Sequence, residues 1–175
     1  FDLIGSSVGG ALASEIASLV ETPVRRLVLI APFGIFLEDD PAADIWAQIP
    51  GPKSIPKLVC SHPERWEAIW EMPADGDEIE WSILQTRSME AAARFLFPFG
   101  KTGVTSRLHR IHNATMLVRG AEDQVLPASY NALFANGIKG PVRTIEIEDA
   151  GHLPEIDNPE DLVREINAFL LDQEN

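Results

Sequence analysis

The 175-residue sequence predicts an α/β protein with a parallel sheet, because apolar runs of strand length alternate with segments whose apolar residues recur at helical spacing. Four runs are expected to form strands, at residues 1–4, 26–31, 115–118 and 143–147. The second and third are continuously apolar at residues 27–30 and 116–118, so we expect helices on both faces of the sheet. The fourth alternates apolar with polar residues, which is typical of a sheet edge, whereas the first is expected to be a buried strand.

Three helices are expected between and after these strands. The helix after Gly9 should bury a stripe of large apolar residues, namely Leu12, Ile16, Leu19 and Val20. A second helix, over residues 128–136, should end at Gly137, because glycine favours helix C-termini. The last helix should begin at Asn158 as its N-cap, with Pro159 in the first helical position. Its expected buried face consists of Leu162, Val163, Ile166, Phe169 and Leu170.

The long segment between the second and third predicted strands differs from the rest of the chain. It contains all four tryptophans, several helical patterns and repeated prolines, so we expect an inserted helical subdomain. The chain is therefore divided into residues 1–33 as the first part of the core, residues 34–107 as the insertion, and residues 108–175 as the last part of the core.

Aromatic residues in this insertion have two possible roles. Trp66, Ile69 and Trp70 recur at helical spacing and are expected to form the insertion's own core. Alternatively, aromatic side chains could line an apolar substrate pocket. The candidates for such a lining are Trp46, Trp66, Trp70, Trp81, Phe95, Phe97 and Phe99.

Composition excludes several classes of partner. Twenty-seven acidic against fourteen basic residues give a formal charge of -13, which should repel nucleic acids and anionic membrane surfaces. No apolar run has the length that a membrane span requires, and no signal-like segment opens the chain. The single cysteine, Cys60, cannot form an internal disulfide, so a cytoplasmic location is expected.

A glycine-rich turn follows the first predicted strand and precedes the first predicted helix. Its sequence, Gly-Ser-Ser-Val-Gly-Gly at residues 5–10, places Ser7 in the G-x-S-x-G pattern of a nucleophile elbow. Side chains at Gly5 or Gly9 are expected to collide where the strand and the helix approach each other. The N–H of Val8 should face an oxyanion formed on an attacked carbonyl, beside the positive end of the helix.

Two further candidate residues follow the third and fourth predicted strands, at the sheet edge where α/β proteins present functional groups. Asp123 lies in the first of these loops and His152 in the second. The order serine, acid, histidine predicts a catalytic triad in which Ser7 is the nucleophile and His152 the general base. Glu122 is an alternative acid. Ser6 is an alternative nucleophile, but unlike Ser7 it does not have a glycine two residues before it and two residues after it.

Residues 5–10, 108–127 and 151–170 together resemble the conserved blocks of the α/β-hydrolase superfamily, and the resemblance spans nearly the whole chain. It implies that residues 1–4 are the family's fifth strand and that residues 34–107 are its cap. The resemblance also implies earlier strands and a loop with a second oxyanion donor, which nothing in this sequence matches. Because losing one such donor costs about 100- to 1000-fold in rate, we expect this chain alone to be a poor catalyst.

The expected reaction is hydrolysis of a small, partly apolar acyl substrate through an acyl-enzyme, without a metal or organic cofactor. An ester, thioester, amide or activated C–C bond would suit the triad. A serine at the elbow argues against haloalkane dehalogenases and epoxide hydrolases, for which the resemblance implies an aspartate. A lyase or acyltransferase on the same fold is one alternative, and a non-catalytic binding protein is another.

Two other groupings of reactive residues have simpler explanations. His109 and His112 are three residues apart, but no third ligand lies near them in the sequence, so we expect surface residues and not a metal site. Cys60 and His62 could form a thiol and base pair. A buried, unreactive Cys60 is the expected alternative.

Overall fold

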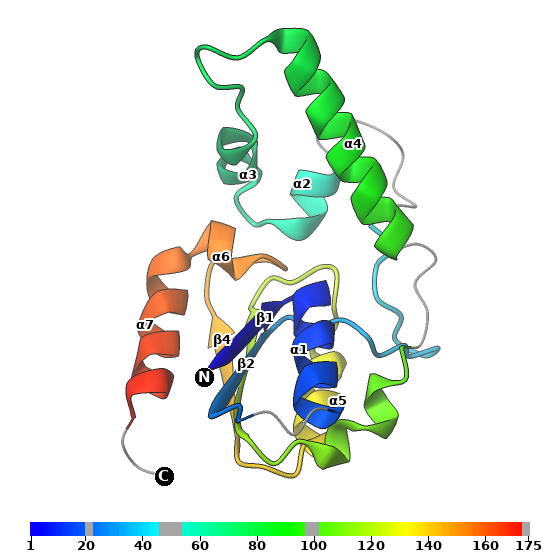
Figure 1. Ribbon diagram of the computed structural model, residues 1–175, viewed down its shortest axis with the longest axis vertical. Coiled ribbons are helices and arrows are strands. Elements are labelled where there is room, and N and C mark those ends of the chain that lie inside the picture. Colours follow the sequence, from blue (N-terminus) through cyan, green and yellow to red (C-terminus); the bar gives the residue numbers. More distant parts are fainter. Residues whose placement is uncertain (20–22, 46–53, 97–101, 173–175) are drawn as a thin grey trace.

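A computed structural model describes residues 1–19, 23–45, 54–96 and 102–172 of the chain. Within these ranges the strands form a four-stranded parallel sheet in the order β1-β2-β3-β4 (Figure 1). The strands are β1 (Leu3–Ser6), β2 (Arg26–Ile30), β3 (Ala114–Gly120) and β4 (Val142–Ile147). The predicted α/β fold with a parallel sheet is therefore confirmed, with boundaries shifted by a few residues.

Helices cover both faces of this sheet, as the continuous apolar strands predict. Helices α1 (Val8–Leu19) and α5 (Ala128–Gly137) pack on one face, where Leu27 and Leu29 of β2 join a core that includes Tyr130 and Phe134 of α5. On the other face, the alternate residues of β2 contact α7 (Pro159–Leu171). This second core contains Val28, Ile30, Met116, Val118, Leu162 and Phe169.

The buried face predicted for α1 is wrong. Leu12 and Leu19 are 61% and 58% exposed, Ile16 is also exposed, and Val20 lies outside the described residues. The helix instead buries small residues, namely Gly10, Ala11, Ala13, Ser14 and Ser18. Small side chains are required because the tight turn after β1 brings α1 close to the strands, and a Cβ on Gly10 would lie 2.9 Å from the Cβ of Pro32.

Two further expectations about exposure are wrong. The strand β1 lies at an edge of the described sheet, and its residue Ile4 is exposed instead of buried. In α7, Val163 is exposed although Leu162 and Phe169 are buried, because the helix contacts the sheet along a narrower stripe than the sequence pattern suggests. The N-cap of α7 is as predicted, since the side chain of Asn158 accepts a hydrogen bond from the amide of Asp161.

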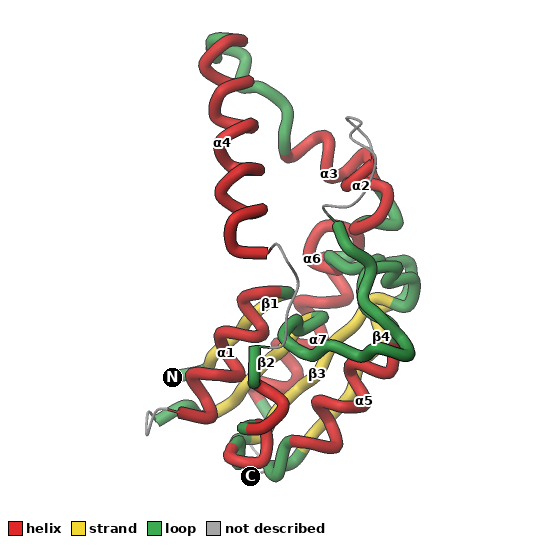
Figure 2. Tube along the Cα trace, turned by 90° about the vertical axis from the view of Figure 1, so that its right-hand side faces the viewer, coloured by secondary structure: helices red, strands yellow, loops and turns green. Residues whose placement is uncertain are grey.

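The segment between β2 and β3 contains the helices α2 (Ser54–Val59), α3 (Pro63–Ile69) and α4 (Glu78–Leu96), followed by the short 3-10 helices η1 (Val104–Ser106) and η2 (Leu108–Arg110). In both views α4 extends away from the sheet, whereas α2 and α3 lie nearer to α6 (Pro154–Asp157) (Figure 2). The two ends of the segment meet, because the Thr102 hydroxyl donates a hydrogen bond of 2.9 Å to the carbonyl of Gly34.

Aromatic residues of this segment pack only in part as expected. The rings of Trp66 and Trp70 stack with centroids 6.1 Å apart, but Ile69 is exposed, so it is not part of a core with them. The helix α3 lies at the surface, and Ile69 is on its solvent-facing side. Trp46, Phe97 and Phe99 fall outside the described residues, as does the side chain of Phe95.

Candidate active site

Three of the predicted site residues meet at the carboxyl ends of the strands. The Ser7 hydroxyl lies 2.9 Å from Nε2 of His152, and Nδ1 of the same ring lies 3.0 Å from Oδ2 of Asp123. The side chains of His152 and Asp123 are only 2% and 1% exposed. A carboxylate can only accept, so Nδ1 donates to Asp123, and in the neutral ring Nε2 is then the nitrogen that accepts the hydrogen bond from Ser7.

The turn between β1 and α1 holds Ser7 in a strained conformation. Its φ of 52° lies in the left-handed region that few residues other than glycine adopt. The conformation is held by the neighbouring strand, since the Ser7 amide donates to the Ile30 carbonyl at 2.8 Å and the Ser7 carbonyl accepts from the Phe33 amide at 3.0 Å. The strained turn therefore presents the hydroxyl at the end of the sheet toward His152.

The glycines of this turn are not equivalent. A Cβ on Gly5 would overlap the backbone of Gly9, as the sequence predicts. A Cβ on Gly9 would meet nothing within 4 Å, so the expected collision at that position is wrong. The backbone of Gly9 lies close to Gly5, but the position that a side chain on Gly9 would occupy is open space. Helix α1 instead comes close to the loop after β2 at Gly10, which faces Pro32.

We expect Gly5→Ala to destabilise the protein by about 3 kcal/mol or more, because the added methyl group overlaps backbone atoms that cannot rotate away. Gly9→Ala serves as the matched control. It places the same methyl group in a helix with free space around it and is expected to raise the free energy of unfolding by up to about 1 kcal/mol. Urea unfolding of both variants measures the difference, and equal midpoints would contradict this account of the turn.

Val8 is the first residue of α1, directly after Ser7. The first amides of a helix have no acceptor within it and lie at its positive end. The Val8 N–H is therefore suited to stabilise negative charge that develops beside the Ser7 oxygen.

The loop after β3 fixes the carboxylate of Asp123 from its far side. Oδ1 accepts hydrogen bonds from the amides of Val125 at 2.8 Å and Leu126 at 2.9 Å, which leaves Oδ2 directed at His152. Glu122 is exposed, and its amide donates to the Ala150 carbonyl at 2.9 Å. Of the two carboxylates considered from the sequence, Asp123 is thus the one that contacts the histidine.

The loop after β4 packs closely against the rest of the site. A Cβ on Gly120 would overlap the carbonyl oxygens of Ala150 and Gly151, so β3 and this loop are in direct backbone contact. The ring of Phe33 contacts the His152 ring edge to face, with centroids 5.4 Å apart. His152 is therefore held by packing as well as by its two hydrogen bonds.

Ser6 does not reach the histidine. Its hydroxyl donates a hydrogen bond of 2.6 Å to Oε1 of Glu155 at the surface. The two neighbouring hydroxyls therefore have different partners, Glu155 for Ser6 and His152 for Ser7.

Cys60 and His62 do not form a reactive pair. Cys60 is buried, and its burial, followed by the nearby charges of Asp157, Glu155 and Glu64, raises the pKa of the thiol to about 12. The thiol is thus protonated at neutral pH and is not a nucleophile. His62 contacts Asp149 instead, with 2.9 Å between Nε2 and Oδ2, and this contact raises the pKa of the imidazole.

His109 and His112 lie at the surface near η2. Within the described ranges, no group of three or more His, Cys, Asp or Glu side chains is arranged to bind a metal ion. None of the helices in the same ranges has both the length and the apolar character needed to cross a lipid bilayer.

Residues 1–165 match the alpha/beta hydrolase family, and the chain therefore belongs to that family. Two curated relatives are similar over nearly the whole chain. One is pyrrolizixenacetamide deacetylase from Xenorhabdus hominickii, 26% identical over 99% of this chain and 66% of the relative. The other is 2-hydroxy-6-oxo-2,4-heptadienoate hydrolase from Pseudomonas putida, 24% identical over 97% of this chain and 63% of the relative. The chain thus spans about two thirds of the length of these relatives.

Solved structures show the same fold. A membrane phospholipase A, described as a bacterial virulence factor, superposes with a TM-score of 0.70 and 21% identity over 97% of this chain and 56% of that one. A meta-cleavage product hydrolase from Pseudomonas fluorescens superposes with a TM-score of 0.67 and 19% identity over 99% of this chain and 65% of that one.

Proposed function

We propose that the protein is a serine hydrolase in which Ser7 is the nucleophile, His152 the general base and Asp123 the acid of a catalytic triad. The observation that carries this proposal is the unbroken series of contacts from the Ser7 hydroxyl through both ring nitrogens of His152 to the Asp123 carboxylate. Three residues distant in the sequence meet in the geometry that transfers a proton from a hydroxyl to an imidazole.

The reaction begins when the Ser7 oxygen attacks a carbonyl carbon and its proton passes to Nε2 of His152. Asp123 stabilises the resulting imidazolium through Nδ1 and keeps the ring oriented. The Val8 N–H donates to the oxyanion, helped by the positive end of α1. His152 then returns the proton to the leaving group, which departs and leaves Ser7 acylated. Water, deprotonated by the same imidazole, attacks the acyl-enzyme and releases the acid.

The substrate class is a small molecule with a carbonyl group open to attack. A deacetylase and a hydrolase named for an oxo-dienoate are similar to this chain over nearly its full length, which favours an amide, an ester or an activated C–C bond. In each of these substrates the bond that breaks is attached to the carbonyl that Ser7 would attack.

We infer further that residues 34–107 form a cap over the site. The ends of this segment are joined by the hydrogen bond from Thr102 to Gly34. Its α2 end contacts the histidine loop, since the Leu153 amide donates to the Val59 carbonyl at 3.1 Å. A segment held at these points is suited to exclude water and to set the size of the substrate.

Labelling with a fluorophosphonate tests this function without knowledge of the substrate. The phosphonate carries an electrophilic phosphorus that an activated serine attacks, with loss of fluoride. We expect the full-length protein to be labelled once, and peptide mapping to find the adduct on Ser7. A folded protein that stays unlabelled, or that is labelled on another serine, would disprove the proposed nucleophile.

A further inference from the structure

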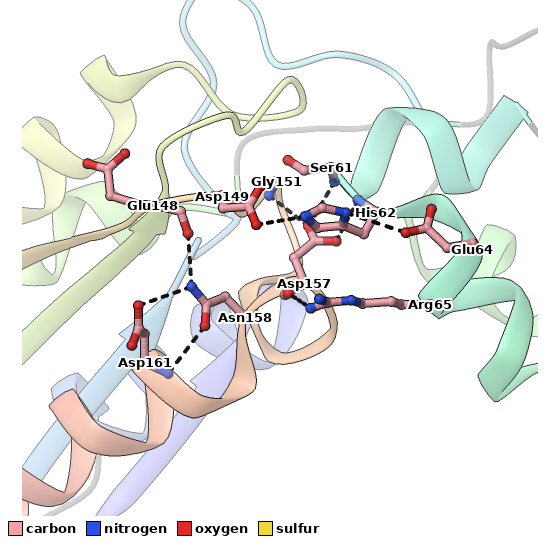
Figure 3. A network of polar contacts seen from close by, with 10 residues as sticks. All are labelled: Ser61, His62, Glu64, Arg65, Glu148, Asp149, Gly151, Asp157, Asn158 and Asp161. Carbon is pink, nitrogen blue, oxygen red and sulfur yellow. Dashed lines mark hydrogen bonds and ion pairs between the residues drawn. The ribbon is translucent and has the colours of Figure 1, made fainter.

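A buried carboxylate near the site takes no part in the proposed triad. Asp157, the last residue of α6, has no exposed surface. Its carboxylate accepts hydrogen bonds from the backbone amides of Gly151 at 2.8 Å, Ser61 at 2.9 Å and His62 at 2.9 Å (Figure 3). Removing a carboxylate from water is costly unless hydrogen bonds compensate, and here such bonds come from two separate segments of the chain.

One of these amides belongs to the residue directly before His152. Gly151 is buried, and a Cβ at this position would lie 3.0 Å from the carbonyl oxygen of Val59 and 3.1 Å from the amide nitrogen of Ser61. The histidine loop and the turn between α2 and α3 are therefore in backbone contact. Asp157 binds the amides on both sides of this contact, which fixes the peptide between Ala150 and Gly151, one peptide before His152.

Other interactions fasten the same junction. Arg65 of α3 donates a hydrogen bond to the backbone carbonyl of Asp157, and Nε2 of His62 lies 2.9 Å from Oδ2 of Asp149 in the histidine loop (Figure 3). The charge of Asp157 also contributes to the raised pKa of the buried Cys60 thiol, as expected of an anion close to that turn. The junction thus links the inserted helices to the loop that carries the histidine.

We propose that Asp157 is a positioning residue for His152, and that it couples the placement of the inserted helices to the alignment of the imidazole with Ser7. This inference rests on the proposed triad. The hydrogen bond of 2.9 Å between Ser7 and His152 tolerates little displacement, and the amide of Gly151 is one peptide away from the histidine. Movement of the α2 end of the insertion therefore changes how well the base meets the nucleophile.

Asp157→Asn tests the inference, because an amide has one accepting oxygen where the carboxylate has two. The native Oδ1 binds the amide of His62, and the native Oδ2 binds the amides of Gly151 and Ser61. In either orientation the NH2 group of the new asparagine faces at least one N–H donor. The matched control is Asp149→Asn, which makes the same chemical change at a carboxylate without a bond to Gly151 and keeps an oxygen that can accept from Nε2 of His62. Its φ of 57° suits asparagine.

The measurement is the rate of fluorophosphonate labelling of Ser7 in the full-length protein as a function of probe concentration. For Asp157→Asn we expect the maximal rate to fall about 10- to 100-fold, with little change in the half-saturating concentration, because the misplaced base affects attack and not probe binding. Asp149→Asn should retain both values. A residue that supported only the fold would not alter the maximal rate of a folded variant.

The possible failures are distinguishable. If wild type is not labelled at Ser7, the proposed function is disproved, and the positioning role with it. If wild type is labelled and a folded Asp157→Asn variant reaches the same maximal rate, the inference alone is wrong. Should the variant not fold, amide hydrogen exchange in wild type decides. The inference requires slow exchange at Gly151, and rapid exchange there would overturn it.

Discussion

Ser7→Ala is expected to lower turnover by roughly a million-fold, the scale at which the nucleophile of a triad acts with its partners as one unit. The methyl group of alanine cannot attack a carbonyl, so the proton relay from the hydroxyl to Nε2 of His152 has no starting point. Hydrolysis of 4-nitrophenyl acetate by the purified full-length protein measures this loss, with the uncatalysed rate subtracted.

Ser6→Ala is the matched control for this change. It removes the same atom from the adjacent residue, but the Ser6 hydroxyl is bonded to Glu155 and not to His152. We expect its turnover to stay within a few-fold of wild type, because an exposed hydrogen bond contributes little to stability or alignment. Comparable losses in both variants, or activity that survives Ser7→Ala, would contradict the assignment of the nucleophile.

The strands of this protein could be predicted because their apolar runs have the length and continuity of buried parallel strands. The meeting of Ser7, Asp123 and His152 followed from topology, since loops at the carboxyl ends of parallel strands lie at one edge of a sheet. These three positions could be proposed as site residues because each lies in a short local motif in the loop after a strand.

Exposure was harder to predict, because it depends on what a helix face meets. Leu12 and Leu19 form an apolar stripe, yet the close approach of α1 to the sheet selects the smaller residues on its other side. The same limit applies to Gly9, whose neighbours are defined only once the helix is placed against β1. Spacing along the chain specifies a face but not the distance to the next layer.

Asp157 was not predicted as a functional residue, because its surroundings come from segments far apart in the sequence. It stands beside Asn158 and Pro159 at the start of a helix, where an acidic residue is ordinary. Its position five residues after His152 is the one local signal. The amides that explain its burial belong to Gly151, Ser61 and His62, and no pattern within the last helix points to the latter two.

Asp123→Asn is expected to lower turnover by about 10,000-fold while leaving the protein folded. The amides of Val125 and Leu126 donate to Oδ1, so the oxygen of the new asparagine takes that side. Its NH2 group then faces Nδ1 of His152 and requires this nitrogen to accept a hydrogen bond. The ring proton moves to Nε2, which can no longer receive the proton of Ser7.

Glu122→Gln is the control for this variant, because it makes the same chemical change at the adjacent, exposed carboxylate, which has no contact with the histidine. Its turnover should match wild type. Thermal unfolding checks that Asp123→Asn is folded at the assay temperature, and 4-nitrophenyl acetate hydrolysis gives the rates. Full activity in a folded Asp123→Asn variant would show that the carboxylate does not set the tautomer of His152, and a large loss in Glu122→Gln would transfer the role of acid to the neighbouring residue.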